Sequence, residues 1–266
     1  MHRVELRRDG VVLSCLTGGP PAAPPVLLLH GLAGAGAELL PTAHALTGDF
    51  RVIVPDQRAH GHSTRRPADL SRDAYVADAA FLLDALGGAR PAAVAGQSMG
   101  GHTAMLLAAH HPELVSSLVM LEAGVGGTSP GDDYPARLGR WFASWPLPFP
   151  SAAAAVSFLG TTPTAHAWAA DLEQHPDGLR PRFDADMMEA AIRPVAAEAR
   201  WAQWQAVRAP TLLIRGERGT CPPEEDARMR ALRPGVRYAT IADAGHDAHL
   251  DQPEAWLTLL RAALTG

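Results

Sequence analysis

The sequence predicts an α/β protein in which a mostly parallel sheet is covered by helices on both faces. The first observation is a series of short apolar runs bounded by Gly and Pro, each too short for a typical helix and typical of a fully buried strand. These runs are residues 26–29, 52–54, 92–95, 118–121 and 211–214, with further strand candidates at 11–16 and 236–241. The second observation is a set of helix-like stretches between the strands, at residues 38–46, 74–86, 100–110, 224–232 and 253–264. Strands that alternate with helices indicate a parallel sheet with two covered faces.

A third observation is a break in this alternation between residues 125 and 205, where five of the six tryptophans lie. We interpret this segment as a helical lid inserted after the sixth strand, so that residues 1–124 and 206–266 form the two parts of one core domain. Lids commonly supply the apolar wall of a pocket, and we expect the lid tryptophans to contact the substrate. The alternative is that they only attach the lid to the core. They are Trp141, Trp145, Trp168, Trp201 and Trp204.

Composition and charge exclude several classes of partner. The chain has 266 residues, a net charge of −5 and no basic tract, which argues against nucleic acid and against an anionic membrane surface. The N-terminus is polar, and no run approaches the roughly 20 apolar residues that span a bilayer. Cys15 and Cys221 are the only cysteines, and we expect two free thiols in a reducing compartment. The sequence thus predicts a soluble cytoplasmic protein, whereas its oligomeric state stays undetermined.

The candidate nucleophile is Ser98, in Gly96-Gln97-Ser98-Met99-Gly100. This pentapeptide follows an apolar run and precedes a helix-like stretch, which is the context of the G-x-S-x-G elbow. A strand that enters a helix through so sharp a turn strains the serine and leaves no room for side chains at the flanking glycines. The serine hydroxyl then stands above the sheet near a helix N-terminus, where negative charge is favoured.

An oxyanion hole is expected from the backbone N–H groups of Leu32 and Met99. Leu32 follows His30-Gly31 at the end of an apolar run, and the small Gly31 lets the backbone approach the nucleophile. A competing interpretation makes His30 a metal ligand, but no second ligand stands at metal-binding spacing near it. We therefore expect no metal and no organic cofactor.

The candidate base is His246, which follows the last strand candidate in Asp243-Ala244-Gly245-His246. A histidine on a loop at the carboxyl end of that strand can reach Ser98. His249 is the local competitor, and Gly245 favours His246 because it frees the backbone of the loop.

These motifs together resemble the α/β-hydrolase superfamily. His30-Gly31, residues 56–63, residues 96–101 and residues 245–254 stand in the order seen in that family, and the resemblance covers nearly the whole chain apart from the lid. It implies an α/β-hydrolase sheet and a serine hydrolase, because relatives with an Asp nucleophile, such as epoxide hydrolases, are disfavoured by Ser98. Within residues 56–63, Asp56 is expected to brace a loop together with Arg58.

The sequence departs from the family at the triad acid. Most relatives carry this Asp in a Gly-x-x-Asp pattern after the next-to-last strand, but here the stretch reads Gly216-Glu217-Arg218-Gly219. Some relatives, including haloalkane dehalogenases and a resorcylic lactone hydrolase with a Ser-His-Glu triad, place the acid after the strand next to the nucleophile. Glu122 occupies that position and is our preferred acid, with Glu217 and Asp226 as alternatives.

The function that the sequence predicts is hydrolysis of an ester or lactone bond in a hydrophobic small molecule, through an acyl-enzyme on Ser98. One alternative is a carbon–carbon bond hydrolase or lyase that uses the same triad, although such relatives often have Trp where Asp247 stands. A second alternative is a non-catalytic ligand-binding protein, against which the intact nucleophile and base argue.

Overall fold

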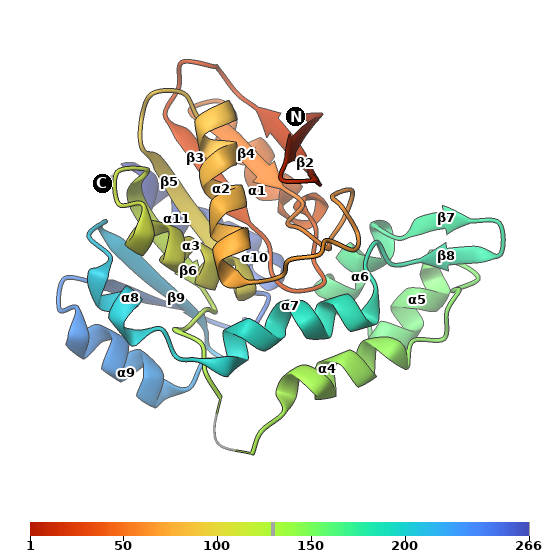
Figure 1. Cartoon of the computed structure of the whole chain (residues 1–266). Coiled ribbons are helices and arrows are strands. Elements are labelled where there is room, and N and C mark those ends of the chain that lie inside the picture. The colour runs from red at the N-terminus through yellow and green to blue at the C-terminus, as the bar shows by residue number, and fades with distance from the viewer. Residues whose placement is uncertain (129–130, 266) are drawn as a thin grey trace.

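The computed structural model describes residues 1–128 and 131–265, and its central feature is an eight-stranded sheet with the order β1-β2-β4-β3-β5-β6-β9-β10 (Figure 1). The first two strands form an antiparallel hairpin, and β2 also pairs antiparallel with β4. The remaining neighbours are parallel, which confirms the predicted mostly parallel sheet. The strands are β1 His2–Arg8, β2 Val11–Gly18, β3 Pro25–Leu29, β4 Arg51–Pro55, β5 Ala92–Gln97, β6 Val115–Leu121, β9 Thr211–Gly216 and β10 Arg237–Ile241.

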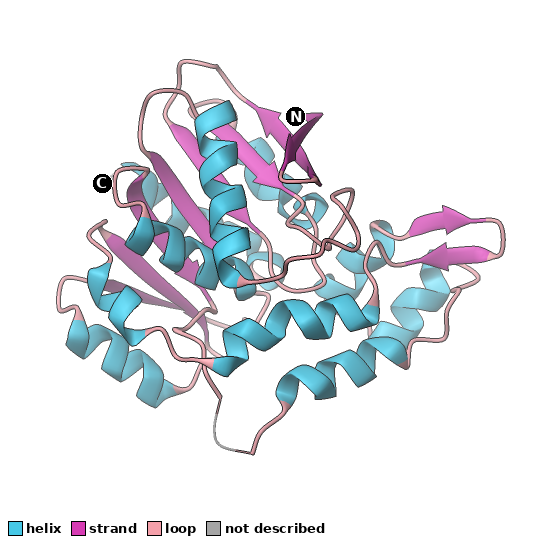
Figure 2. Ribbon diagram, in the orientation of Figure 1, coloured by secondary structure: helices cyan, strands magenta, loops and turns pink. Residues whose placement is uncertain are grey.

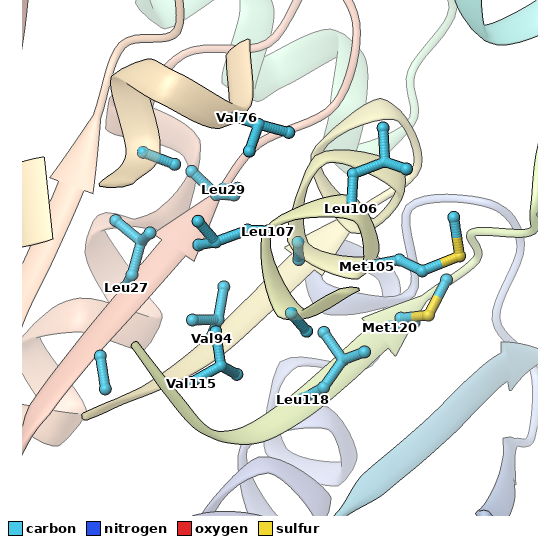
Figure 3. Close-up of a cluster of buried hydrophobic side chains, with 14 of the residues drawn as sticks. Leu27, Leu29, Val76, Val94, Met105, Leu106, Leu107, Val115, Leu118 and Met120 are labelled. Atoms are coloured by element: carbon cyan, nitrogen blue, oxygen red, sulfur yellow. The ribbon is translucent and has the colours of Figure 1, made fainter. Parts of the chain in front are cut away.

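Helices cover both faces of the sheet, as the continuous burial of the central strands requires. All five residues of β3 and all six of β5 are buried, so alternate side chains enter two separate cores. The first core lies under α2, α3, α8 and α9, and Figure 3 shows part of it around Val94 and Leu107. The second core lies under α1 and α11. These helices are η1 Gly36–Leu39, α1 Leu40–Leu46, α2 Arg72–Leu86, α3 Met99–His110, α8 Trp201–Ala206, α9 Pro223–Leu232, α10 Ala248–Asp251 and α11 Pro253–Thr265.

In its described part, the segment of residues 125–200, which we call the insertion, contains four helices and a small hairpin. Helices α4 and α7 lie side by side along it, and the hairpin projects at its far end (Figures 1 and 2). An aromatic cluster that includes Phe142, Phe149 and Phe183 holds these elements together. The elements are α4 Tyr134–Ala143, α5 Ala152–Leu159, α6 Pro163–Ala170, β7 Glu173–His175, β8 Gly178–Arg180 and α7 Ala185–Ala197.

Two details of the insertion differ from the sequence prediction. It is not wholly helical, because β7 and β8 pair as an antiparallel hairpin. Helix α8 lies at residues 201–206, inside the predicted lid, but its Trp204 is fully buried in the core under α3. The lid boundary at residue 205 is therefore too late, and the insertion ends near Arg200.

None of the helices in the described ranges combines the length and the apolar character that a membrane span requires.

Candidate active site

Ser98 lies at the junction of β5 and α3, in the strained turn that the sequence predicts. Its φ of 52° and ψ of −120° place a non-glycine residue in a sparsely populated conformation. A Cβ on Gly100 would lie 2.3 Å from the Leu29 carbonyl oxygen, so the tight packing of α3 against β3 requires glycine there. Ser98 itself is only partly buried, whereas Met99 is buried. The turn thus presents the serine to solvent at the carboxyl edge of the sheet.

The loop after β3 lies directly against this turn. A Cβ on Gly31 would lie 2.1 Å from Gln97 Oε1 and 3.3 Å from Ser98 Cβ, so a larger residue would have to displace the Gln97 side chain and crowd the serine. The Met99 amide belongs to the first turn of α3, where N–H groups have no partner within the helix. Within the described residues, the Leu32 amide donates no hydrogen bond to another backbone carbonyl. Neither amide thus donates to a backbone carbonyl in the described residues, and the oxyanion hole stays a prediction.

His30 shapes this loop as a hydrogen-bonded neutral ring. Its Nε2 accepts a hydrogen bond from the Gln57 amide at 2.9 Å, so the proton is on Nδ1, which donates to the Gly31 carbonyl at 2.7 Å. Burial lowers the pKa of His30, which favours the same neutral form. With both ring nitrogens engaged, His30 is a structural residue of the loop.

His246 lies on the loop after β10, and its ring faces Glu122. The His246 Nδ1 atom lies 3.3 Å from Glu122 Oε2 and 2.8 Å from Thr220 Oγ1. The loop is fixed by two further bonds: Gly245 N donates to Asp251 Oδ2 at 2.8 Å, and Gln97 Nε2 donates to the His246 carbonyl at 3.1 Å. The second bond joins the loop to the residue that precedes the nucleophile. An Nδ1–H directed at a carboxylate leaves Nε2 free to accept a proton.

Glu122 is the carboxylate that the fold brings to His246. It ends β6 with a φ of 47°, and its side chain is fully buried. Its Oε1 accepts a hydrogen bond from Gly216 N at 2.9 Å, and its Oε2 accepts one from Thr220 N at 2.8 Å. Burial alone would raise the pKa of Glu122, but the hydrogen bonds from His246 and from these two amides outweigh burial and lower the pKa. The group is therefore ionised at neutral pH beside the imidazole.

The space where most relatives carry their acid is filled by Glu122. A Cβ on Gly219 would lie 2.1 Å from Glu122 Oε1. A side chain at position 219, on the loop after β9, would therefore occupy the space that the Glu122 side chain fills. The alternative acids lie elsewhere: Asp226 pairs with Arg215 at 2.5 Å inside the core, and Glu217 Oε2 accepts a hydrogen bond from Asp243 N at 2.9 Å. Glycine at position 219 and glutamate at position 122 are thus two parts of one arrangement.

Two residues near His246 were not anticipated from the sequence. Thr220 contributes its amide to Glu122 and its hydroxyl to His246. Gln97 connects the nucleophile turn to the histidine loop, and its Nε2 also lies 3.2 Å from Asp247 Oδ1. Gln97 lies inside the nucleophile motif, which could have drawn attention to it. Thr220 had no such signal, because it follows a stretch that is notable only for lacking the expected Asp.

The lid tryptophans separate into two groups. Trp141, Trp145 and Trp168 pack together, with ring centroids 5.4 to 6.2 Å apart. Trp141 and Trp168 line a cavity of about 290 Å³ that His246 and Asp247 also line. Trp141 and Trp168 therefore lie beside the candidate base, whereas Trp145 is buried and packs against both of them.

Trp201 and Trp204 do not belong to this group, which corrects the sequence prediction. Trp204 is fully buried in the main core, where its Nε1 donates to the Met229 carbonyl at 2.9 Å. Trp201 packs at the edge of the same core, and the Arg228 guanidinium carbon lies 3.9 Å from the centroid of the Trp201 ring. Both residues belong to α8, which packs against α3. They therefore support the core, and we no longer count them among the candidate substrate-binding residues.

The remaining sequence candidates have structural partners. Asp56 does brace its loop, through hydrogen bonds from Gly36 N at 2.7 Å and His62 N at 3.0 Å. Its partner is Arg3 at 2.7 Å, not the expected Arg58, which pairs with Asp78. His249, the competitor of His246, is buried, and its Nε2 lies 3.9 Å from Glu38 Oε1, away from the triad carboxylate.

The sheet order, the strained serine turn and the histidine loop together define a hydrolase of the alpha/beta hydrolase fold. The model of that family matches residues 24–253, and the chain belongs to the family.

Among curated proteins, the chain is similar to the sn-1-specific diacylglycerol lipase ABHD11 of Mus musculus, with 28% identity over 94% of this chain and 83% of that protein. Among solved structures, E-2-(acetamidomethylene)succinate hydrolase has a TM-score of 0.86 at 23% identity and is covered in full by the full length of this chain. The enol-lactonase from Burkholderia xenovorans LB400 has a TM-score of 0.80 at 22% identity, over 99% of this chain and 100% of the other.

Proposed function

We propose that this hydrolase cleaves an ester or lactone bond of a hydrophobic small molecule through an acyl-enzyme on Ser98, with His246 as base and Glu122 as the triad acid. The observation that carries the proposal is the contact between His246 Nδ1 and the buried Glu122 carboxylate, at the edge of the sheet where Ser98 stands. An ionised carboxylate at Nδ1 fixes the ring tautomer that has a basic Nε2.

The mechanism follows from this geometry. His246 takes the proton of Ser98 as the serine oxygen attacks the substrate carbonyl. The amides of Leu32 and Met99 bind the negative oxygen of the tetrahedral intermediate, and losing one such donor costs about 2.7 to 4 kcal/mol of transition-state stabilisation. His246 then protonates the leaving group and afterwards activates the water that releases the acid.

The substrate class is inferred from the cavity beside His246. Indole rings of Trp141 and Trp168 and the Leu159 side chain give it apolar walls. Trp141 is 41% exposed, although it is a large apolar residue. Such a surface favours a leaving group or acyl group with an apolar, planar portion. Names of relatives among lipases and enol-lactonases support ester or lactone chemistry in the same family.

The decisive experiment combines labelling with product analysis. A fluorophosphonate probe should label the wild-type protein and not the Ser98→Ala variant. A panel of esters, lactones, thioesters and β-diketones then separates acyl transfer to water from carbon–carbon bond cleavage. Turnover of β-diketones without turnover of esters or lactones would replace this proposal with the carbon–carbon hydrolase, and absence of both labelling and turnover would favour a ligand-binding protein.

A further inference from the structure

Arg72, at the start of α2, is the buried arginine whose charge the structure leaves without a carboxylate. Three arginines have side chains that are almost fully buried: Arg58, Arg72 and Arg215. Arg58 pairs with Asp78 at 2.7 Å, and Arg215 pairs with Asp226 at 2.5 Å. Among the described residues, no carboxylate pairs with Arg72, and its Nε and Nη1 atoms have no hydrogen-bond partner. An unpaired buried cation is costly, so its retention indicates a partner that arrives from outside the chain.

The surroundings of Arg72 do not neutralise its charge. Its guanidinium stacks on the Tyr75 ring, 4.5 Å from the centroid, and Nη2 donates to Thr103 Oγ1 and, at 3.4 Å, to the Met99 carbonyl. Burial lowers the pKa of Arg72 to about 10, which still leaves it protonated at neutral pH. The positive charge of Arg200 also lowers the pKa of Arg72.

Arg72 also lies beside the oxyanion hole and under the insertion. Met99, whose carbonyl it contacts, follows the nucleophile and packs with Tyr75 in a small apolar cluster. Leu32 packs against the same cluster, and so do Ile192 of α7 and Leu138 of α4. The cluster therefore connects the turn after the nucleophile with α4 and α7 of the insertion.

We propose that Arg72 binds an anionic group, a carboxylate, carried by the acyl part of the substrate. The proposal rests on the proposed acyl-transfer function and narrows its substrate class to esters or lactones of acids that bear a second carboxylate. The Nε and Nη1 atoms have no hydrogen-bond partner, so the guanidinium has N–H groups left to donate to a carboxylate oxygen, and a hydrogen bond between two charged groups is a strong one. Because Arg72 is buried, binding of this group requires the structure to open locally at this position.

The test compares two esters that differ only at the end of the acyl chain: monophenyl adipate, which is anionic, and phenyl hexanoate, which is neutral. Wild-type kcat/KM should favour monophenyl adipate by about 10- to 100-fold, as expected for hydrogen bonds to a charged group. Arg72→Met should remove this preference, and Arg72→Lys should retain part of it because a point charge remains. Arg233→Met is the matched control: Arg233 also stacks on an aromatic ring, the indole of Trp204, but in the core, and its loss should leave the preference intact.

A binding measurement keeps the test independent of turnover. Adipate dianion should raise the Tm of Ser98→Ala and not that of Ser98→Ala with Arg72→Met, at ionic strength matched with NaCl. If neither ester is hydrolysed, the wider panel decides on the proposed function and the Tm shift alone decides on Arg72. An unchanged adipate-to-hexanoate ratio in Arg72→Met overturns the proposal. If Arg72→Met does not fold, equal wild-type kcat/KM for the two esters, or no Tm shift with adipate, overturns it.

Discussion

Moving the triad acid from β6 to the loop after β9 is a direct test of Glu122. A Cβ on Gly219 would lie 2.1 Å from Glu122 Oε1, so an aspartate at position 219 cannot coexist with the native glutamate without displacement. In a Glu122→Ala background the same space is empty, and Gly219→Asp would place a carboxylate there from the opposite side. Three variants follow: Glu122→Ala, Gly219→Asp and the double variant.

The magnitudes come from the hydrogen bonds of Glu122. Its loss leaves the amides of Gly216 and Thr220 without their acceptor, at about 1 to 3 kcal/mol for each one that water does not reach. Loss of the carboxylate that orients the base costs about 10⁴-fold in kcat in a serine triad, or about 5.4 kcal/mol. Gly219→Asp alone overpacks the site, which costs about 1 to 3 kcal/mol of stability. We expect the double variant to regain at least about tenfold in kcat over Glu122→Ala, because Nδ1–H of His246 again has an acceptor.

The assay is kcat for the best ester of the panel, with folding followed by circular dichroism and urea denaturation. The prediction is a positive interaction between the two substitutions, each harmful alone and partly compensating together. Full activity of Gly219→Asp alone would mean that Glu122 does not fill this space. A folded double variant with no gain over Glu122→Ala, or an Asp226→Ala variant that is folded but inactive, would refute the assignment of the acid.

The other predictions concern charge, nucleophile and tryptophans. Hydrogen bonds lower the pKa of Glu122 below its usual 4.5, so its ionised form stabilises the fold above about pH 4.5. This contribution is lost as the pH falls through the lowered pKa. Urea midpoints should therefore fall more steeply below pH 4.5 for the wild type than for Glu122→Gln. Activity should fall at acid pH, since protonated His246 cannot accept the Ser98 proton, and a flat kcat/KM profile would contradict this role. Trp204→Ala should destabilise the fold by about 3 to 5 kcal/mol in urea denaturation. Trp141→Ala should cost about 1 kcal/mol or less of stability and chiefly raise KM. The reverse pattern would refute our placement of the two residues.

The sequence alone determined the sheet, and it predicted the two site residues that have the clearest local signals. Apolar runs in β3, β5 and β9 are continuous because both faces of those strands are buried, and this burial is visible in the order of residues. The bend at Ser98 is equally local, since the glycines that permit it stand two positions away on either side. His246 was found because Gly245 precedes it on a loop after the last strand.

Tertiary structure decided what depends on contacts between distant segments. Glu122 was a choice among three carboxylates until the pairing of β6 with β9 placed it between Gly216, Thr220 and His246. The five tryptophans were indistinguishable in sequence, because an indole is equally apolar in a pocket wall and in a core; only the packing of α8 against α3 assigns Trp204 to the core. Local sequence fixes the dihedral angles and the periodicity of burial, but a side chain's partner across the sheet is set by strand order, which no single segment encodes.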